Sequence, residues 1–139
     1  EAAATRLGAI APTLPVERMV GGPVAELIIG LTGDPQFGLA LVLGAGGVLT
    51  ELLGDSATLL LPATREEIER ALSSLRVWRL VTGFRGKAGD AAAVIAAVEA
   101  VAAFAAAHEG LVEELDVNPL LVLRDGAVAV DALIRMRSP

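Results

Sequence analysis

An interleaving of acidic and apolar residues near the end of the chain constrains the fold more than any other stretch. Apolar and acidic side chains are interspersed from Val112 to Val117, as in a strand with one wet face and one buried face. Two further apolar runs, 120–123 and 127–131, are separated by Arg124-Asp125-Gly126. Asp-Gly between apolar runs is a strong hairpin signal. The stretch therefore predicts antiparallel strands.

The predicted hairpin gathers three polar side chains on one face. With a two-residue loop at 125–126, Asn118 pairs with Leu133 and is a diagonal neighbour of Asp131. Diagonal neighbours lie roughly 7–8 Å apart, which lets two short oxygen-bearing side chains share one ion. Asp116 points to the same side, because side chains alternate along a strand. The pattern therefore predicts a cluster of oxygen ligands.

Oxygen ligands of this kind select a hard cation. The chain has no Cys and a single His, so carboxylate and amide oxygens favour Mg²⁺ or Mn²⁺. Mg²⁺ held by one or two carboxylates normally also binds substrate phosphates. A solvated strand face that ends at a proline is the alternative interpretation. The pattern alone leaves both open.

The composition excludes several kinds of site and partner. The 139 residues suit one domain. The net charge of −6 argues against a nucleic-acid surface, which needs clustered Lys and Arg. The lack of Cys excludes thiol catalysis and disulfides, so we expect a cytoplasmic protein. The apolar run 91–107 is short for a membrane span and contains Glu99. We therefore expect a buried helix there and no membrane partner.

The rest of the chain consists of predicted strands with helices grouped between them. A capping box of Thr64 and Glu67 opens a helix that runs to about Leu75. Asp90 is the expected N-cap of a second helix, to about Ala107. Apolar runs predict strands at 16–20, 24–31, 37–43, 48–53 and 57–61. This order predicts an α+β fold around a largely antiparallel sheet, not a Rossmann order.

Two loops carry residue types that bind anions. The run Gly44–Gly47 lies between β-like runs, where the amides of Gly46 and Gly47 could approach a phosphate. A tight strand turn explains these glycines equally well. Arg85, in the polar turn 83–86, could clamp an oxyanion. A solvated loop arginine is the alternative.

Taken in order, these motifs form a specific series. They are Val16–Val20, Glu26–Gly30, Asp34–Gly38, Gly44–Glu51, Pro62–Glu67, Gly83–Gly86, Glu114–Pro119 and Val130–Ala132. The series resembles the ATP-grasp domain of NDP-forming acyl-CoA synthetases. More distantly, it is similar to the nucleotide-binding half of the succinyl-CoA synthetase β-subunit. The resemblance implies that residues 16–139 are the C-terminal subdomain of such a domain. Residues 1–15 are then a lead-in or the boundary of an excised piece.

The resemblance implies a reaction and its cofactors. Such enzymes interconvert acyl-CoA, phosphate and ADP with free acid, CoA and ATP. They work through an acyl phosphate and a phosphohistidine on another domain, and the ATP-grasp part handles the step between phosphohistidine and nucleotide. The expected cofactors are ATP or ADP with Mg²⁺, or Mn²⁺ in its place. CoA is expected on a domain absent from this chain, and the choice between ADP and GDP is open.

The resemblance also assigns roles to residues. Asn118 and Asp131 are the expected Mg²⁺ ligands, with Asp116 close by. Phosphoryl transfer needs positioning and charge neutralisation, so Arg85 is the expected catalytic cation. The expected nucleotide contacts are Glu17, Met19 and Val20, in a hinge strand whose backbone meets the adenine, and Gly46 and Gly47.

One departure from the family pattern defines the expected partners. The lysine-bearing first half of the nucleotide clamp would precede Val16, and the CoA-binding and phosphohistidine domains are also missing. We therefore expect these parts as partners, little activity of the chain alone, and self-association through apolar surface around 24–31. The alternative is a non-catalytic regulatory domain, for example one fused to an acetyltransferase. Retention of Asp116, Asn118 and Asp131 favours the enzyme.

Overall fold

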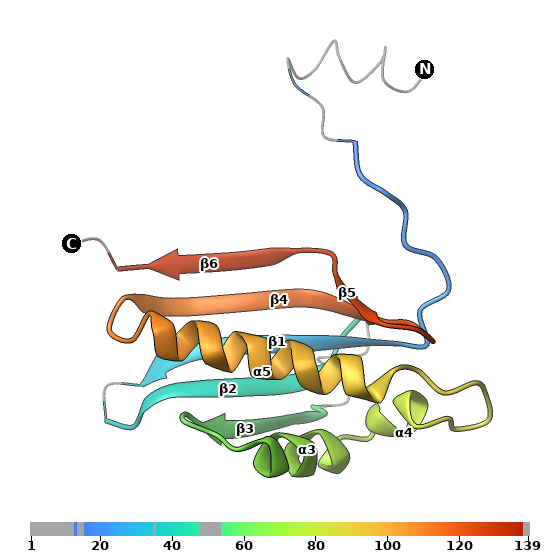
Figure 1. Cartoon of the computed structure of the whole chain (residues 1–139), viewed down its shortest axis with the longest axis horizontal. Coiled ribbons are helices and arrows are strands. Elements are labelled where there is room, and N and C mark those ends of the chain that lie inside the picture. The colour runs from blue at the N-terminus through green and yellow to red at the C-terminus, as the bar shows by residue number, and fades with distance from the viewer. Residues whose placement is uncertain (1–12, 14–15, 35, 48–53, 138–139) are drawn as a thin grey trace.

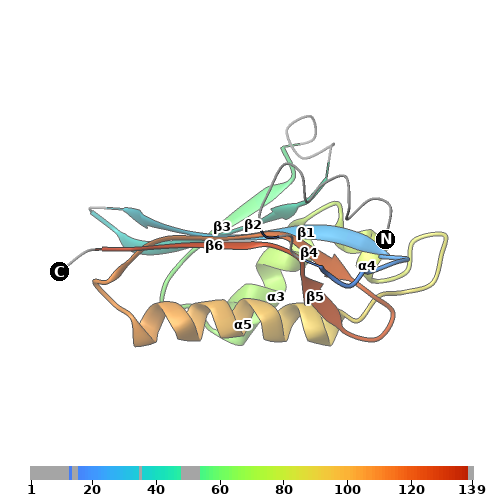
Figure 2. The same cartoon turned by 90° about the horizontal axis from the view of Figure 1, so that it is seen from above.

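A six-stranded antiparallel sheet carries its helices on one face (Figures 1 and 2). The computed structural model describes residues 13, 16–34, 36–47 and 54–137. The strands follow the order β3-β2-β1-β4-β5, and β6 also pairs with β4. They are β1 (Ala25–Asp34), β2 (Gly38–Ala45), β3 (Ser56–Leu60), β4 (Val112–Val122), β5 (Ala127–Ala129) and β6 (Ala132–Met136). The helices are α3 (Arg65–Ser74), α4 (Trp78–Val81) and α5 (Ala91–Ala107).

The central strand β1 separates a covered face from an open face. Ala25, Leu27, Ile29 and Leu31 are buried and alternate with more exposed residues. These four belong to the hydrophobic core, together with Ile68 and Leu72 of α3 and Val94 and Val98 of α5. The other face of the sheet has no helix on it among the described residues (Figure 2). This asymmetry confirms the predicted α+β class and leaves one sheet face for other contacts.

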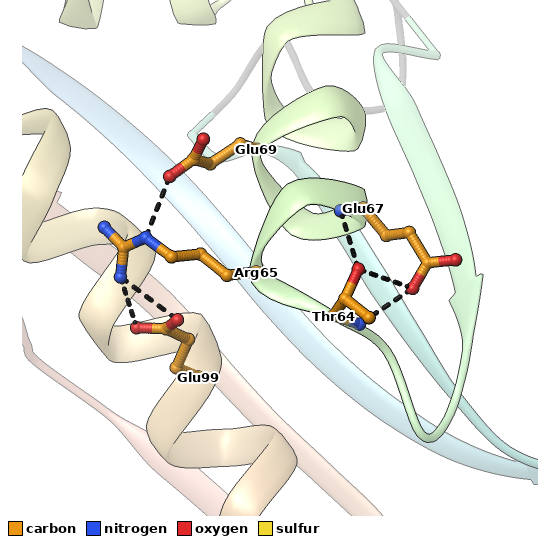
Figure 3. A network of polar contacts seen from close by, with 5 residues as sticks. All are labelled: Thr64, Arg65, Glu67, Glu69 and Glu99. Carbon is orange, nitrogen blue, oxygen red and sulfur yellow. Dashed lines mark hydrogen bonds and ion pairs between the residues drawn. The ribbon is translucent and has the colours of Figure 1, made fainter.

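Both long helices begin at the predicted caps. The hydroxyl of Thr64 accepts from the amide of Glu67 at 3.3 Å, and the Glu67 carboxylate accepts from the amide of Thr64 at 2.7 Å (Figure 3). The Asp90 carboxylate accepts from the amide of Ala93 at 2.9 Å. These bonds satisfy amide groups that have no partner within the helix. None of the described helices is long and apolar enough to cross a membrane.

The predicted strand at 16–20 is wrong. These residues are assigned to neither helix nor strand, and Val16 and Met19 are 97% and 91% exposed. Pairing begins only at Val24, whose amide donates to the carbonyl of Val122 at 2.7 Å. Strand propensity is expressed where a neighbouring strand and a packed face are available, and 16–20 has neither among the described residues. The strand predicted at 48–53 lies outside the described residues.

Candidate metal and nucleotide site

The β4–β5 turn is one residue earlier than predicted. The amide of Leu123 donates to the carbonyl of Gly126 at 3.0 Å, so Arg124 and Asp125 are the loop residues in place of Asp125 and Gly126. Gly126 follows the turn at a φ of 93°, a left-handed conformation that glycine adopts without strain. The pairs from Val122 with Ala127 to Glu114 with Arg135 therefore shift by two residues from the predicted register.

This shift changes the neighbours of each residue. A two-residue shift alone changes no face, because the side-chain period of a strand is two. Leu120 nevertheless lies in the helix-covered core, where regular alternation from Asn118 would put it on the same face as Asn118. Asp116 pairs with Leu133, and the amide of Asn118 donates to the carbonyl of Asp131 at 3.2 Å. Asn118 therefore lies opposite Asp131, where a diagonal placement and a Leu133 partner were predicted. The corrected register brings the two expected ligands closer together than the predicted one.

A bulge in β4 directs these side chains away from the core. Leu27 and Ile29 are two residues apart on β1, but their partners Leu120 and Val117 are three apart on β4. The extra residue lets Val117 and Leu120 both face the helices, as their burial shows. Asn118, next to Val117, is exposed on the opposite face. The bulge thus allows Val117 and Leu120 to be buried while Asn118, which lies between them in the chain, is exposed.

The oxygen atoms on the open face fit a partly hydrated hard cation. Asp116 is half-buried, while Asn118 and Asp131 are exposed. One Asp131 carboxylate oxygen accepts from the amide of Ala132 at 2.8 Å. Within the described ranges, no group of three or more His, Cys, Asp or Glu side chains could hold a metal. Two carboxylates and an amide are a sparse set that suits Mg²⁺, which keeps waters and takes phosphate oxygens.

The glycines after β2 have a packing role that is visible in the structure. The amide of Gly46 donates to the carbonyl of Glu26 at 2.7 Å, and a Cβ on Gly46 would lie 3.0 Å from the Glu26 carbonyl carbon. Gly47 has a φ of 80° and lies beside the Glu26 carboxylate. Only residues without a side chain allow this approach. The contact with Glu26 gives both glycines a packing role, and their predicted role at a phosphate stays a prediction.

Glu26 is a site candidate that the sequence analysis did not single out. Its neighbours Ala25 and Leu27 are buried on the helix side, so its half-buried side chain belongs to the open face. A Cβ on Gly47 would lie 3.0 Å from one of its carboxylate oxygens. The available signal was its position at the start of the Glu26–Gly30 motif. Its carboxylate adds negative charge to the face that carries Asp116.

Arg85 and the expected hinge residues are not brought to the three oxygen ligands. The Arg85 guanidinium lies 5.6 Å from the Phe84 ring centroid, in an exposed loop beyond α4 (Figure 1). In the part of the chain that the structure describes, Arg85 makes no contact with Asp116, Asn118 or Asp131. The hinge residues Glu17, Met19 and Val20 lie in an extended segment that leaves the sheet (Figure 1). Their predicted roles stay predictions.

A large hollow lies elsewhere on the molecule. It measures about 1040 Å³ and is bordered by the β1–β2 turn, the start of α3 and the second half of α5. Arg65 bridges Glu69 and Glu99 at its edge, with 2.9 Å ion pairs (Figure 3). None of Asp116, Asn118 and Asp131 lines it. The expected metal ligands lie on an open sheet face and not in a pocket. The size of this hollow is therefore no reason to place the nucleotide in it.

Comparisons with known proteins agree with the order of the motifs. Residues 1–136 match the model of a family described as ATP-grasp domain. The chain is 33% identical over 118 residues to ADP-forming acetate–CoA ligase II subunit beta of Pyrococcus furiosus, over 83% of this chain and 50% of that subunit. It is 35% identical over 117 residues to ADP-forming acetate–CoA ligase I of Archaeoglobus fulgidus, over 84% of this chain and 17% of that protein.

A solved structure with a similar fold also comes from a CoA-dependent synthetase. It is a dinucleotide-forming acetyl-coenzyme A synthetase 1 of Ca. Korarchaeum cryptofilum, with a TM-score of 0.77 and 34% identity. The match covers 84% of this chain and 55% of that one. That protein was solved with coenzyme A and Mg-AMPPCP, its phosphohistidine segment pointing towards the nucleotide binding site. The chain thus spans about half the length of the Pyrococcus subunit and of the solved chain.

Proposed function

Because the chain belongs to the ATP-grasp domain family, we propose that it is the second half of the nucleotide clamp of an NDP-forming acid–CoA ligase. In this proposal it binds nucleotide and metal while a phosphoryl group passes between the nucleotide and a phosphohistidine on another domain. Relatives that are ADP-forming CoA ligases support the proposal. A structural neighbour that binds coenzyme A and Mg-AMPPCP supports it as well.

One observation carries this proposal: Asn118 lies opposite Asp131 on the open sheet face, with Asp116 on the same side. These residues would hold Mg²⁺, or Mn²⁺, through a carboxamide oxygen and carboxylate oxygens. When bound, such an ion neutralises charge on the phosphate oxygens of the nucleotide. A solvated strand face without a ligand has no need for three oxygen-bearing side chains close together. The presence of Asp116, Asn118 and Asp131 therefore favours a nucleotide site.

Other residues of the chain have positioning roles in the proposal. The backbone groups of 16–20 make no hydrogen bond within the described residues. They are therefore available to an adenine ring, as expected for Glu17, Met19 and Val20. Gly46 and Gly47 bring the end of β2 close to the ligand face. Arg85 supplies a cation for phosphate oxygens once the missing half of the clamp closes over the nucleotide.

Substitutions of Asn118 and Asp131, the proposed metal pair, test the proposal in the enzyme assembled with its other domains. We expect Asp131→Asn and Asn118→Ala to slow nucleotide-dependent CoA ligation roughly 100-fold, since a catalytic metal contributes several kcal/mol. The melting temperature should change little, because both side chains are exposed. Asp125→Asn is the matched control. It makes the same chemical change in the neighbouring turn and should leave the rate unchanged.

The same measurement separates the two functions considered from the sequence. A non-catalytic regulatory domain has no need of the metal pair, so its partner's activity would be the same in all three variants. Equal ligation rates for Asp131→Asn and Asp125→Asn would therefore reject the nucleotide-clamp proposal.

A further inference from the structure

Positive charge is concentrated in one segment of this acidic protein. The chain has 11 Lys and Arg against 17 Asp and Glu, but residues 76–87 contain no acidic side chain. The cations in that segment are Arg76, Arg79, Arg85 and Lys87. Among the described residues, neither these four nor Arg124 forms an ion pair with a carboxylate.

Lys87 and Arg124 line a small hollow at the end of the sheet. Its volume is about 260 Å³, and Gly22, Phe84 and Gly86 also border it. The segments come together from distant parts of the sequence: the approach to β1, the loop after α4 and the β4–β5 turn (Figure 1). Pockets for whole drug-sized ligands measure roughly 300–1,000 Å³. This hollow is therefore the size for one charged group of a larger molecule.

Backbone hydrogen bonds fix the walls of the hollow to the end of β4. The amide of Val24 donates to Val122, and the amide of Asp90 donates to Leu123, at 2.7 and 2.8 Å. The amide of Gly126 donates to the Asp90 carboxylate at 2.9 Å. Because these segments are already held in place, few protein groups lose conformational freedom when a ligand binds, and the loss of affinity from ordering them is small. Both Asp90 oxygens accept from backbone amides, and this carboxylate forms no ion pair with a cation among the described residues.

Two guanidinium groups contact the ring of Phe84, which borders the hollow. Arg79 and Arg85 lie 5.0 and 5.6 Å from the centroid of Phe84. Arg85 also holds a φ of 52°, a conformation that is uncommon for a residue with a side chain. Both guanidinium groups are positively charged, so together they favour an anion near this ring. The arrangement is suited to an anion with more than one negative charge.

We propose that this hollow binds a phosphate or pyrophosphate group of a nucleotide-type molecule. Lys87 provides a compact charge, and Arg124 provides a planar fork that matches phosphate oxygens. The backbone of Gly22 and Gly86 approaches the same space without side chains in the way. None of Asp116, Asn118 and Asp131 lines the hollow, so binding there requires no metal. The inference therefore stands apart from the proposed metal pair.

Calorimetric titration of the 139-residue chain with pyrophosphate tests the site. The titration is done in EDTA at low ionic strength, because salt screens exposed charges. We expect Lys87→Ala and Arg124→Ala each to raise the dissociation constant at least tenfold. Arg70→Ala is the matched control. It removes one charge from an exposed arginine on α3 that borders neither hollow, and should change the constant less than twofold.

Competition identifies the molecule that carries the phosphate. Displacement of pyrophosphate by metal-free ATP assigns the hollow to the nucleotide, and displacement by CoA assigns it to CoA. Retention of pyrophosphate against both would overturn a nucleotide-type ligand for this hollow. Equal affinities in Lys87→Ala, Arg124→Ala and Arg70→Ala would overturn the site, as would no measurable binding. Asp131→Ala should bind metal-free pyrophosphate normally, so failure here and failure of the nucleotide clamp are distinguishable.

Discussion

At the scale of single residues, Gly46 shows how a small side chain shapes the ligand face. A Cβ on this glycine would meet three Glu26 atoms at 3.0 to 3.2 Å, two of them backbone atoms that cannot rotate away. We expect Gly46→Ala to lower the free energy of unfolding by about 1–3 kcal/mol, the usual cost of overpacking. Urea denaturation measures this change.

Gly21→Ala is the control for that substitution. Gly21 has nothing within 4 Å of an added Cβ, and its φ lies outside the left-handed region. Its replacement should leave the denaturation midpoint unchanged or raise it slightly, because alanine restricts the unfolded chain. Equal midpoints for Gly46→Ala and the wild type would show that the end of β2 can move away from Glu26.

The candidate ligands also show which properties of a residue depend only on its neighbours in the sequence and which depend on tertiary contacts. Asp116 and Asn118 are two residues apart on β4, and the two-residue period of a strand predicts that they share a side. The side of Asp131 does not follow from this period, because the bulge in β4 and the break between β5 and β6 interrupt the alternation. The partner of Asn118 depends on the turn, and the turn depends on a contact with Asp90, 36 residues from Gly126. No local pattern contains that contact. The role of Glu26 beside Gly47 is likewise a product of tertiary packing.

At the scale of elements, Asp90 joins α5 to the β4–β5 turn. Its carboxylate accepts from the amides of Ala93 and Gly126, and these bonds hold the pKa of the carboxyl below its ordinary value. A lowered folded-state pKa stabilises the fold above the unfolded pKa of an aspartate, about 3.9. That contribution is lost as the pH falls through the folded pKa. Stability from this contact is therefore sensitive to acid.

Asp90→Asn should remove this acid sensitivity. We expect the wild type to melt at a higher temperature than the variant at pH 7, because the charged carboxylate makes stronger bonds with the two amides. The difference should shrink as the pH falls below about 4. Thermal denaturation followed by circular dichroism at several pH values measures the melting temperatures of the wild type and of Asp90→Asn. Asp125→Asn, an exposed neighbour with no hydrogen bond to its side chain in the described structure, should show no such trend.

The elements also differ in how far their own sequence determines them. α3 and α5 begin at the predicted caps because a cap is a contact within three residues. The predicted strand at 16–20 is not formed, because a strand needs a partner that its own residues do not specify. β4 runs from Val112 to Val122 and joins the alternating stretch 112–117 to the apolar run that begins at Leu120. Its bulge absorbs Asn118 and Pro119 without ending the pairing.

At the scale of the whole molecule, the described helices all lie on one side of the sheet. The helices bury one face, whereas Leu60 and Leu133 remain 54% and 58% exposed on the other. The chain spans about half of the relatives it matches. We infer that the open face, with its metal pair, meets the other half of the clamp in the assembled enzyme. This explains why ligand residues and exposed apolar residues share one surface.

The 139-residue chain by itself should therefore be a weak nucleotide binder. Nucleotide pockets gain affinity by burying most of the ligand between preformed walls, and this chain offers one wall. Loss of several kcal/mol lowers affinity about tenfold for each 1.4 kcal/mol. We expect Mg·ATP to bind no more tightly than roughly the millimolar range in a calorimetric titration, with no measurable ATPase activity. Addition of the missing half should restore tight binding in the wild type but not in Asp131→Asn. Micromolar binding of Mg·ATP by the chain alone would mean that the described residues form a complete site, and that the one-walled clamp is wrong.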